Sequence, residues 1–216
     1  GKIEDKGVMI MGKTTAVNHL NELSLFSGYG GFSLGLKLAG LKARTIAYCD
    51  NEPYVQEILK ARINDGYIDN APIISDISSF DFRVFRGVCD IITAGFPCQP
   101  HSHAGSRLGE SDERNFWPDT KRVISEVGCQ YVLLENVPGI LSNGYGGTVV
   151  GELSEIGYDC RWEIISASDV GAPHLRQRWW CFAELAHSNG KRGCCWDTTG
   201  QYAKDVGESS RCKKPR

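Results

Sequence analysis

A cysteine and an acid, each placed after an apolar run, are the residues of this chain best suited to covalent chemistry. Cys98 follows the run 89–94 within Gly-Phe-Pro-Cys-Gln-Pro-His-Ser (95–102), and Glu135 closes the run 131–134. Such runs are typical of buried parallel strands, whose carboxyl ends carry the chemistry of open α/β sheets. A thiolate there could attack an electrophilic carbon while the carboxyl manages the proton that moves. Cys98 could equally be a buried, unreactive thiol.

Two arginines and a polar segment could complete such a site. Arg176 and Arg178 lead into the apolar run 179–184, and residues two apart on a strand point the same way. They could grip a phosphate or a base edge, or form an ion pair with an acid such as Glu135. The polar segment 103–115 has no periodicity, which is typical of a functional loop in a compact domain.

The elements that would position these residues begin with a strand at 23–26, a glycine-rich turn and a helix at 32–40. Gly28, Gly30 and Gly31 allow a sharp turn and a close approach to a ligand. Further strands are predicted at 42–49, 71–74, 89–94, 129–135, 160–166 and 179–184, and further helices at 54–63, 119–127 and 147–156. This alternation predicts an α/β fold with a mostly parallel sheet.

Two acids follow strands that come after the glycine turn. Asp50 ends the strand 42–49, about 20 residues after the turn, where nucleoside-binding folds place the acid that accepts from ribose hydroxyls. Asp50 or Asn51 could also cap the helix 54–63, and both interpretations can hold for the same loop. Asp76 could accept from an adenine amino group or simply shape a turn.

Composition restricts the class of protein. The chain has 216 residues, 41% hydrophobic and 23% charged, enough for one sizeable α/β domain. It has no signal-peptide pattern and no apolar run long enough to span a membrane. The net charge of −2 indicates that any nucleic acid is held by a local patch. Nine cysteines without a Cys-x-x-Cys pair favour free thiols in a cytoplasmic setting, with no metal site expected.

Residues 7–14 match the phosphate-binding pattern G-x-x-x-x-G-K-[ST]. Only six residues precede Gly7, too few for the buried strand that such a loop needs. The four positions between the two glycines are bulky and apolar, which favours a strand over a phosphate nest. We therefore expect no nucleotide site there.

In order and spacing, the motifs resemble those of the DNA (cytosine-5) methyltransferases, which use S-adenosylmethionine. The resemblance covers about 23–184 and is strongest to bacterial and phage members. The matching pieces are Phe26-Ser-Gly-Tyr-Gly-Gly31, Asp50, Asp76, Gly95-Phe-Pro-Cys-Gln99, Glu135-Asn136-Val137 and Gly171-Ala-Pro-His-Leu-Arg-Gln-Arg178. It implies a Rossmann-like methyltransferase fold, a twisted sheet with helices on both faces.

The resemblance also implies a role for each matching residue. The catalytic residues would be Cys98, Glu135, Arg176 and Arg178, with Cys98 adding to C6 of a cytosine flipped out of its duplex. The cofactor residues would be Phe26, Gly28, Tyr29, Gly30, Gly31, Asp50, Asn51, Asp76, Ile77 and Pro97. The substrate-binding residues would be Gln99, Ser102, Arg114 and Asn136.

The same resemblance predicts the organisation of the chain. Residues 1–22 would be an N-terminal extension, 23–186 the catalytic domain, and 187–216 a polar, basic-leaning tail that begins a target-recognition region. The expected partner is double-stranded DNA, with a second chain or a further segment supplying target recognition and the rest of the cofactor pocket. The expected location is the cytoplasm of a prokaryote, or of a host in which a phage gene is expressed. A tRNA cytosine-5 methyltransferase and a non-catalytic subunit remain alternatives.

Overall fold

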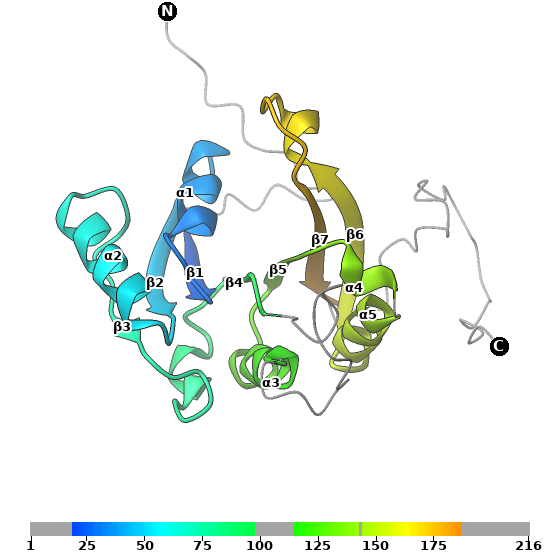
Figure 1. Cartoon of the computed structure of the whole chain (residues 1–216). Helices are drawn as coiled ribbons and strands as arrows, with labels where there is room; N and C mark the ends of the chain where they lie inside the picture. Colours follow the sequence, from blue (N-terminus) through cyan, green and yellow to red (C-terminus); the bar gives the residue numbers. More distant parts are fainter. Residues whose placement is uncertain (1–18, 98–114, 143, 187–216) are drawn as a thin grey trace, which may run out of the picture.

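Alternating strands and helices assemble into a seven-stranded sheet with helices packed against it (Figure 1). The computed structural model describes residues 19–97, 115–142 and 144–186. The strands are β1 (Leu20–Leu25), β2 (Ala43–Cys49), β3 (Ile73–Ile74), β4 (Ile91–Ala94), β5 (Tyr131–Asn136), β6 (Tyr158–Ser166) and β7 (Gln177–Leu185). The helices are α1 (Gly31–Leu38), α2 (Pro53–Asn64), α3 (Trp117–Val127), α4 (Gly139–Ser142) and α5 (Tyr145–Glu155), with 3-10 turns η1 (Phe82–Phe85) and η4 (Ala167–Val170).

The strand order is β3-β2-β1-β4-β5-β7-β6. Strands β1 to β5 are parallel, whereas β7 runs antiparallel to both of its neighbours, β5 and β6. The chain moves outward from β1 to β3 and then returns to β4 on the other side of β1. Ligands of open α/β sheets bind at such a reversal, beyond the carboxyl ends of the strands. The predicted α/β fold with a mostly parallel sheet is confirmed.

Helices cover both faces of the sheet, so the central strands are buried on both sides. Leu23 packs with Ile124 of α3 and Leu153 of α5 in the larger core cluster. On the opposite face, Tyr48 packs with Leu59 of α2. Strand β4 is buried at every position, which explains its continuous apolar run. Within the described part of the chain, no helix has the length and apolar character needed to cross a membrane.

Glu22 is an acidic side chain in the middle of this sheet. It lies on β1 and is fully buried. One carboxyl oxygen accepts a hydrogen bond from the Thr45 hydroxyl on β2, and the other accepts one from the Thr93 hydroxyl on β4, both at 2.7 Å. A buried polar group is costly without such partners. Glu22 therefore links β1 to both of its neighbours, β2 and β4, which lie on opposite sides of the reversal point.

Most elements begin within two or three residues of their predicted positions, and the differences have local causes. Strand β1 begins at Leu20 rather than at 23 and ends before Phe26, whose φ of 50° is incompatible with a strand. Helix α3 begins at Trp117 rather than at 119. Pro118 is accommodated because the first turn of a helix does not need its missing N–H.

Candidate active site

The turn between β1 and α1 has the tight geometry that its glycines predict. Phe26, Gly28 and Gly30 all have positive φ, at 50°, 53° and 79°. The Ser27 hydroxyl donates to the Ser24 carbonyl at 2.9 Å and accepts from the Cys49 N–H at 3.1 Å. These bonds fasten the turn to the ends of β1 and β2. Ser27 is not among the predicted site residues, and the only sequence signal for its role is a serine inside a glycine-rich turn, where its hydroxyl can bond the nearby backbone.

Asp50 links the end of β2 to the glycine turn. One carboxylate oxygen accepts from the Gly28 N–H at 2.9 Å, and the other accepts from the Glu52 N–H at 3.1 Å. The alternative interpretation as a helix cap is wrong, because Glu52 is the N-cap residue of α2 and has no capping side-chain hydrogen bond. Asn51, which follows Asp50, and Tyr29, which follows Gly28, are both exposed. Asp50 thus lies at the end of β2 and against the glycine turn, and its contact with a ribose stays a prediction.

Asp76 follows β3 and is exposed, whereas its neighbour Ile77 is buried. The Asp76 carboxylate accepts hydrogen bonds from the Ser79 hydroxyl and from the Ser78 N–H. These bonds hold the pKa of the Asp76 carboxyl below its usual value. The turn-shaping interpretation is therefore confirmed, and a contact of Asp76 with adenine stays a prediction.

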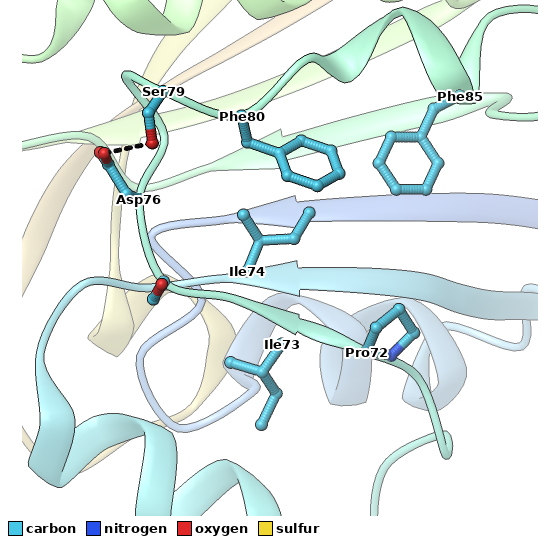
Figure 2. A pocket seen from close by; sticks show the side chains of 8 residues that line it. Pro72, Ile73, Ile74, Asp76, Ser79, Phe80 and Phe85 are labelled. Carbon is cyan, nitrogen blue, oxygen red and sulfur yellow. Dashed lines mark hydrogen bonds between the residues drawn. The ribbon is translucent and has the colours of Figure 1, made fainter.

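A cavity of about 440 Å³ lies at the outer edge of β3 (Figure 2). Asp76 and Ser79 form a polar corner joined by their hydrogen bond, and Phe80 and Phe85 line the apolar part. The remaining lining residues are Pro72, Ile73, Ile74 and Ser75. The other residues predicted to bind the cofactor do not line this cavity, so it is distinct from the turn that holds Asp50.

On the other side of the reversal point, the segment after β4 is held by β5. Phe96 is buried, and its ring lies 5.3 Å from that of Trp117 at the start of α3. The Asn136 side chain, which is 5% exposed, donates to the Phe96 carbonyl at 2.9 Å. Pro97, the last described residue before the gap, is half-buried. Asn136 thus fixes the backbone two residues before Cys98.

Glu135 and Arg178 form an ion pair at the carboxyl end of β5. The Arg178 Nε lies 2.7 Å from the Glu135 carboxylate, and both side chains are about a quarter exposed. A Cβ added at Gly95 would lie 3.2 Å from the second carboxylate oxygen and 3.7 Å from the Phe32 ring. Glycine at position 95 therefore leaves room for the acid. The ion pair was one of the two alternatives for the arginines.

Arg176 is not brought to this group. It precedes β7 and is exposed, so only Arg178 of the pair lies on the strand. Cys98, Gln99, Ser102 and Arg114 lie outside the described residues, as do the loop 98–114, the motif 7–14 and the tail 187–216. Among the described residues, no group of three or more His, Cys, Asp or Glu side chains is placed to hold a metal ion.

The described cysteines are free thiols, and most are buried. Cys49 lies beside Asp50, within the predicted cofactor region. Burial, followed by the nearby charge of Asp50, raises the pKa of Cys49 to about 12. Since the thiolate is the nucleophile, this sulfur is unreactive near neutral pH. Cys49 is therefore not an alternative to Cys98 as the candidate nucleophile.

A family model described as C-5 cytosine-specific DNA methylase matches residues 20–209. The type II methyltransferase M.CviJI of Paramecium bursaria Chlorella virus IL3A is 38% identical over 163 residues, which cover 74% of this chain and 42% of that protein. M.NgoMIV of Neisseria gonorrhoeae is 31% identical over 159 residues, covering 72% and 49%. The chain therefore spans about half the length of these curated relatives, or less.

Two solved structures share the fold. A putative DNA modification methyltransferase encoded within an E. coli prophage has a TM-score of 0.61 at 27% identity, covering 77% of this chain and 47% of that one. The S. pombe Dnmt2 methyltransferase has a TM-score of 0.63 at 26% identity, covering 81% and 59%. The predicted resemblance is confirmed by a family match that spans most of the sequence. The chain belongs to the C-5 cytosine-specific DNA methylase family.

Proposed function

We propose that this chain is the catalytic part of an enzyme that transfers a methyl group from S-adenosylmethionine to C5 of cytosine in DNA. The observation that carries the proposal is the placement of Glu135. Its carboxylate lies against Gly95, three residues before Cys98, and is ion-paired with Arg178. Family membership and the M.CviJI and M.NgoMIV matches, both to type II methyltransferases, support the same activity.

The residues at the reversal point fit the proposed cofactor. Apart from the adjoining residues and backbone, no atom lies within 4 Å of a Cβ built on Gly28 or Gly31, whereas one built on Gly30 would lie 3.1 Å from the Ile68 side chain; the turn therefore leaves open space at its first and last glycines. Asp50 fixes the turn and keeps lone pairs for the two ribose hydroxyls. Phe26, Gly30, Tyr29, Asn51 and Pro97 are proposed contacts around it, with Asp76 and Ile77 at the adenine. When bound, S-adenosylmethionine supplies an electrophilic methyl group on its sulfonium.

The proposed reaction begins at the base. The Cys98 thiolate forms a bond to C6 of the flipped cytosine, which moves the C5–C6 electron pair toward N3, where Glu135 offsets the developing charge. C5 would then take up the methyl group that S-adenosylmethionine supplies, and S-adenosylhomocysteine would leave as the bond between sulfur and the methyl carbon breaks. A base removes the C5 proton, the C5–C6 double bond re-forms, and the bond to Cys98 breaks. Arg178 and Arg176 would orient the base and its phosphate, and Asn136 would hold the backbone that leads into Cys98.

We also propose a role for each segment of the chain. Residues 23–186 would be the catalytic unit, following an extension at 1–22, and 187–216 would lead into target recognition. Gln99, Ser102 and Arg114 would contact the substrate, with Asn136 as a further candidate. A further segment or a second chain would supply base reading and complete the cofactor pocket. The two relatives support this proposal, because the match to this chain covers only 42% and 49% of their lengths.

Transfer of labelled methyl groups to duplex DNA and to tRNA, measured side by side, tests the activity. We expect the label to appear in DNA. Cys98→Ser should abolish transfer while leaving cofactor binding nearly unchanged. DNA that contains 5-fluorocytosine should form a covalent complex with the protein, because fluorine at C5 cannot leave as a proton. Label only in tRNA would replace DNA by RNA as substrate. Cofactor binding without transfer to either, with or without a partner chain, would indicate a non-catalytic subunit.

A further inference from the structure

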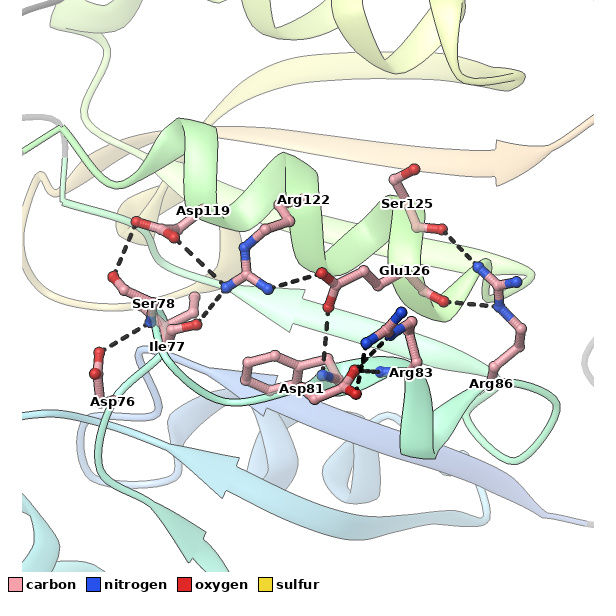
Figure 3. A network of polar contacts seen from close by, with 11 residues as sticks. Asp76, Ile77, Ser78, Asp81, Arg83, Arg86, Asp119, Arg122, Ser125 and Glu126 are labelled. Carbon is pink, nitrogen blue, oxygen red and sulfur yellow. Dashed lines mark hydrogen bonds and ion pairs between the residues drawn. The ribbon is translucent and has the colours of Figure 1, made fainter.

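A network of polar contacts joins α3 to the loop that follows β3 (Figure 3). At its centre is Arg122 of α3, whose side chain is 32% exposed. Its guanidinium donates to the Ile77 carbonyl and to Glu126 at 2.9 Å, and lies 6.0 Å from the Phe82 ring. It also lies 3.5 Å from the Asp119 carboxylate. One side chain therefore connects a helix to the residue directly after Asp76.

The same loop is fastened to α3 at a second point. The Ser78 hydroxyl donates to the Asp119 carboxylate at 3.2 Å, while the Ser78 N–H donates to Asp76 at 2.9 Å. Asp119 is in turn paired with Arg122. Ile77 and Ser78, which directly follow Asp76, are thus both held by neighbouring residues of one helix. In Figure 3 Asp76 stands at the outer end of this chain of contacts, beyond Ser78.

Arg122 also acts on Asp76 through its charge. The pKa of Asp76 is lowered first by hydrogen bonds from Ser79 and Ser78, and the positive charge of Arg122 lowers it further. Asp76 is exposed, so this long-range effect is small compared with its direct hydrogen bonds. The geometry of the loop, rather than the charge, is therefore the main consequence of Arg122.

We propose that Arg122 is a positioning residue for adenine recognition: by holding Ile77 and Ser78 against α3, it fixes the direction in which Asp76 accepts from the adenine amino group. This inference rests on the proposed function, since it takes the cofactor's adenine to lie at Asp76 and Ile77. The planar guanidinium suits the task because it offers several donors in fixed directions. A lysine in its place keeps the charge but cannot hold Ile77, Asp119 and Glu126 together.

Two ligands that differ only at the purine test the proposal by calorimetry. S-adenosylhomocysteine carries the amino group that Asp76 would accept from, whereas S-inosylhomocysteine carries a carbonyl oxygen there. A hydrogen bond to a charged group contributes enough to predict a preference of about tenfold or more for the adenine form in the unaltered chain. In Arg122→Met we expect the affinity for the adenine form to fall about tenfold and the preference to shrink to about twofold. Loss of overall stability alone would not change the ratio between the two ligands.

Arg86→Met is the matched control. Arg86 also fastens its loop to α3, donating to the carbonyls of Glu126 and Ser125, but it does not contact the loop at Asp76. It should keep the full preference. If Arg122→Met does not fold, Arg122→Lys takes its place, with the same direction of change expected.

One outcome would contradict the positioning role of Arg122, and another would contradict the proposed cofactor. An unchanged preference in the folded Arg122 variant, with normal affinity, would overturn the positioning role and leave the proposed function intact. Failure to bind S-adenosylhomocysteine, both by the unaltered chain and by that chain together with the segment or partner that completes the pocket, would instead contradict the proposed cofactor, and with it this inference.

Discussion

The two halves of the sheet edge differ in how their acids are held. On the side of β1, β2 and β3, Asp50 and Asp76 accept hydrogen bonds from the N–H groups of nearby turns. On the side of β4, β5 and β7, Glu135 is paired with Arg178, another residue of the proposed site. The first arrangement leaves lone pairs free for a ligand and needs no change on binding. In the second, Glu135 and Arg178 already satisfy each other, so a base bound as proposed would have to replace part of their interaction.

This difference indicates two kinds of recognition. On the proposed cofactor side, affinity would depend on backbone geometry that is already fixed. On the proposed catalytic side, the ion pair would be exchanged for contacts with the substrate, since partly exposed ion pairs are weak enough to exchange. Substitutions on the cofactor side should therefore change the affinity for the cofactor, and substitutions on the catalytic side should change the rate of methyl transfer.

The largest effect is expected from Glu135→Gln. Without the carboxylate, the charge that develops at N3 of the base is not offset, so single-turnover methyl transfer should fall about 100-fold or more. The dissociation constant for S-adenosylhomocysteine should change by less than about twofold. Glu184→Gln, at the other end of the β5–β7 pair, is the control and should keep full activity. Equal losses in both variants would make Glu135 a structural residue.

Asp50→Asn should lower the affinity for the cofactor rather than the rate of methyl transfer. It weakens the charged hydrogen bonds at the glycine turn and the proposed ribose contacts, so cofactor affinity should fall about 10- to 100-fold in calorimetry. Asp69→Asn is well matched, because Asp69 accepts from the Thr45 N–H at 2.9 Å at the other end of β2. If Asp69→Asn lowers cofactor affinity as much, the Asp50 effect reflects the stability of β2 and not the site.

A smaller loss of rate is expected from Asn136→Ala. This change removes the hydrogen bond to the Phe96 carbonyl, so the backbone entering Cys98 can shift and the thiol loses its alignment. The rate of methyl transfer should fall about tenfold at saturating cofactor, with unchanged cofactor affinity. Gln130→Ala, which removes a similar bond to the Leu185 carbonyl, should leave the rate unaltered. A rate loss shared by both would remove Asn136 from the site.

The smallest effect concerns acid stability. A carboxyl whose pKa is lower in the folded protein stabilises it above its unfolded pKa of about 3.9, and this contribution is lost as the pH falls through the lower folded value. The pKa of Asp76 is lowered in this way. The unfolding free energies of the unaltered chain and Asp76→Asn should therefore differ at pH 6 and converge in strong acid. Asp81→Asn, which removes another acid with a lowered pKa, should show the same convergence without loss of cofactor affinity.

Much of this arrangement could be predicted because strand ends and turns carry local signals. Apolar runs located the strands, and the fold then placed Asp50 and Glu135 at one edge. Asn136 shows the limit of such signals. Successive residues of a strand face opposite sides, so Glu135 points toward Gly95 while Asn136 is buried beneath Phe96. The sequence predicted a contact with substrate for Asn136, which stays a prediction beside the observed backbone contact.

Arg122 shows a second limit. Its contact with Ile77 spans 45 residues, and no motif marks Arg122. The positions of α3 and of the loop after β3 are set by packing in the core, including that of Ile77 and Ile124. A basic residue on an amphipathic helix is ordinarily a solvated side chain. Only the folded arrangement therefore identifies Arg122 as part of the loop's support.

Glu22 has a consequence for how the chain reaches this fold. Its carboxyl must meet Thr45 and Thr93 at the same time, on strands separated from it by 23 and 71 residues. Apolar strands such as β4 could slide by two residues and still bury the same kind of side chain. In a shifted arrangement, however, the acid would remain in the core without both of its partners, at a considerable cost in free energy. Glu22 thus selects one strand register, the one in which the ends of β1, β2 and β4 that carry the proposed site are aligned with each other.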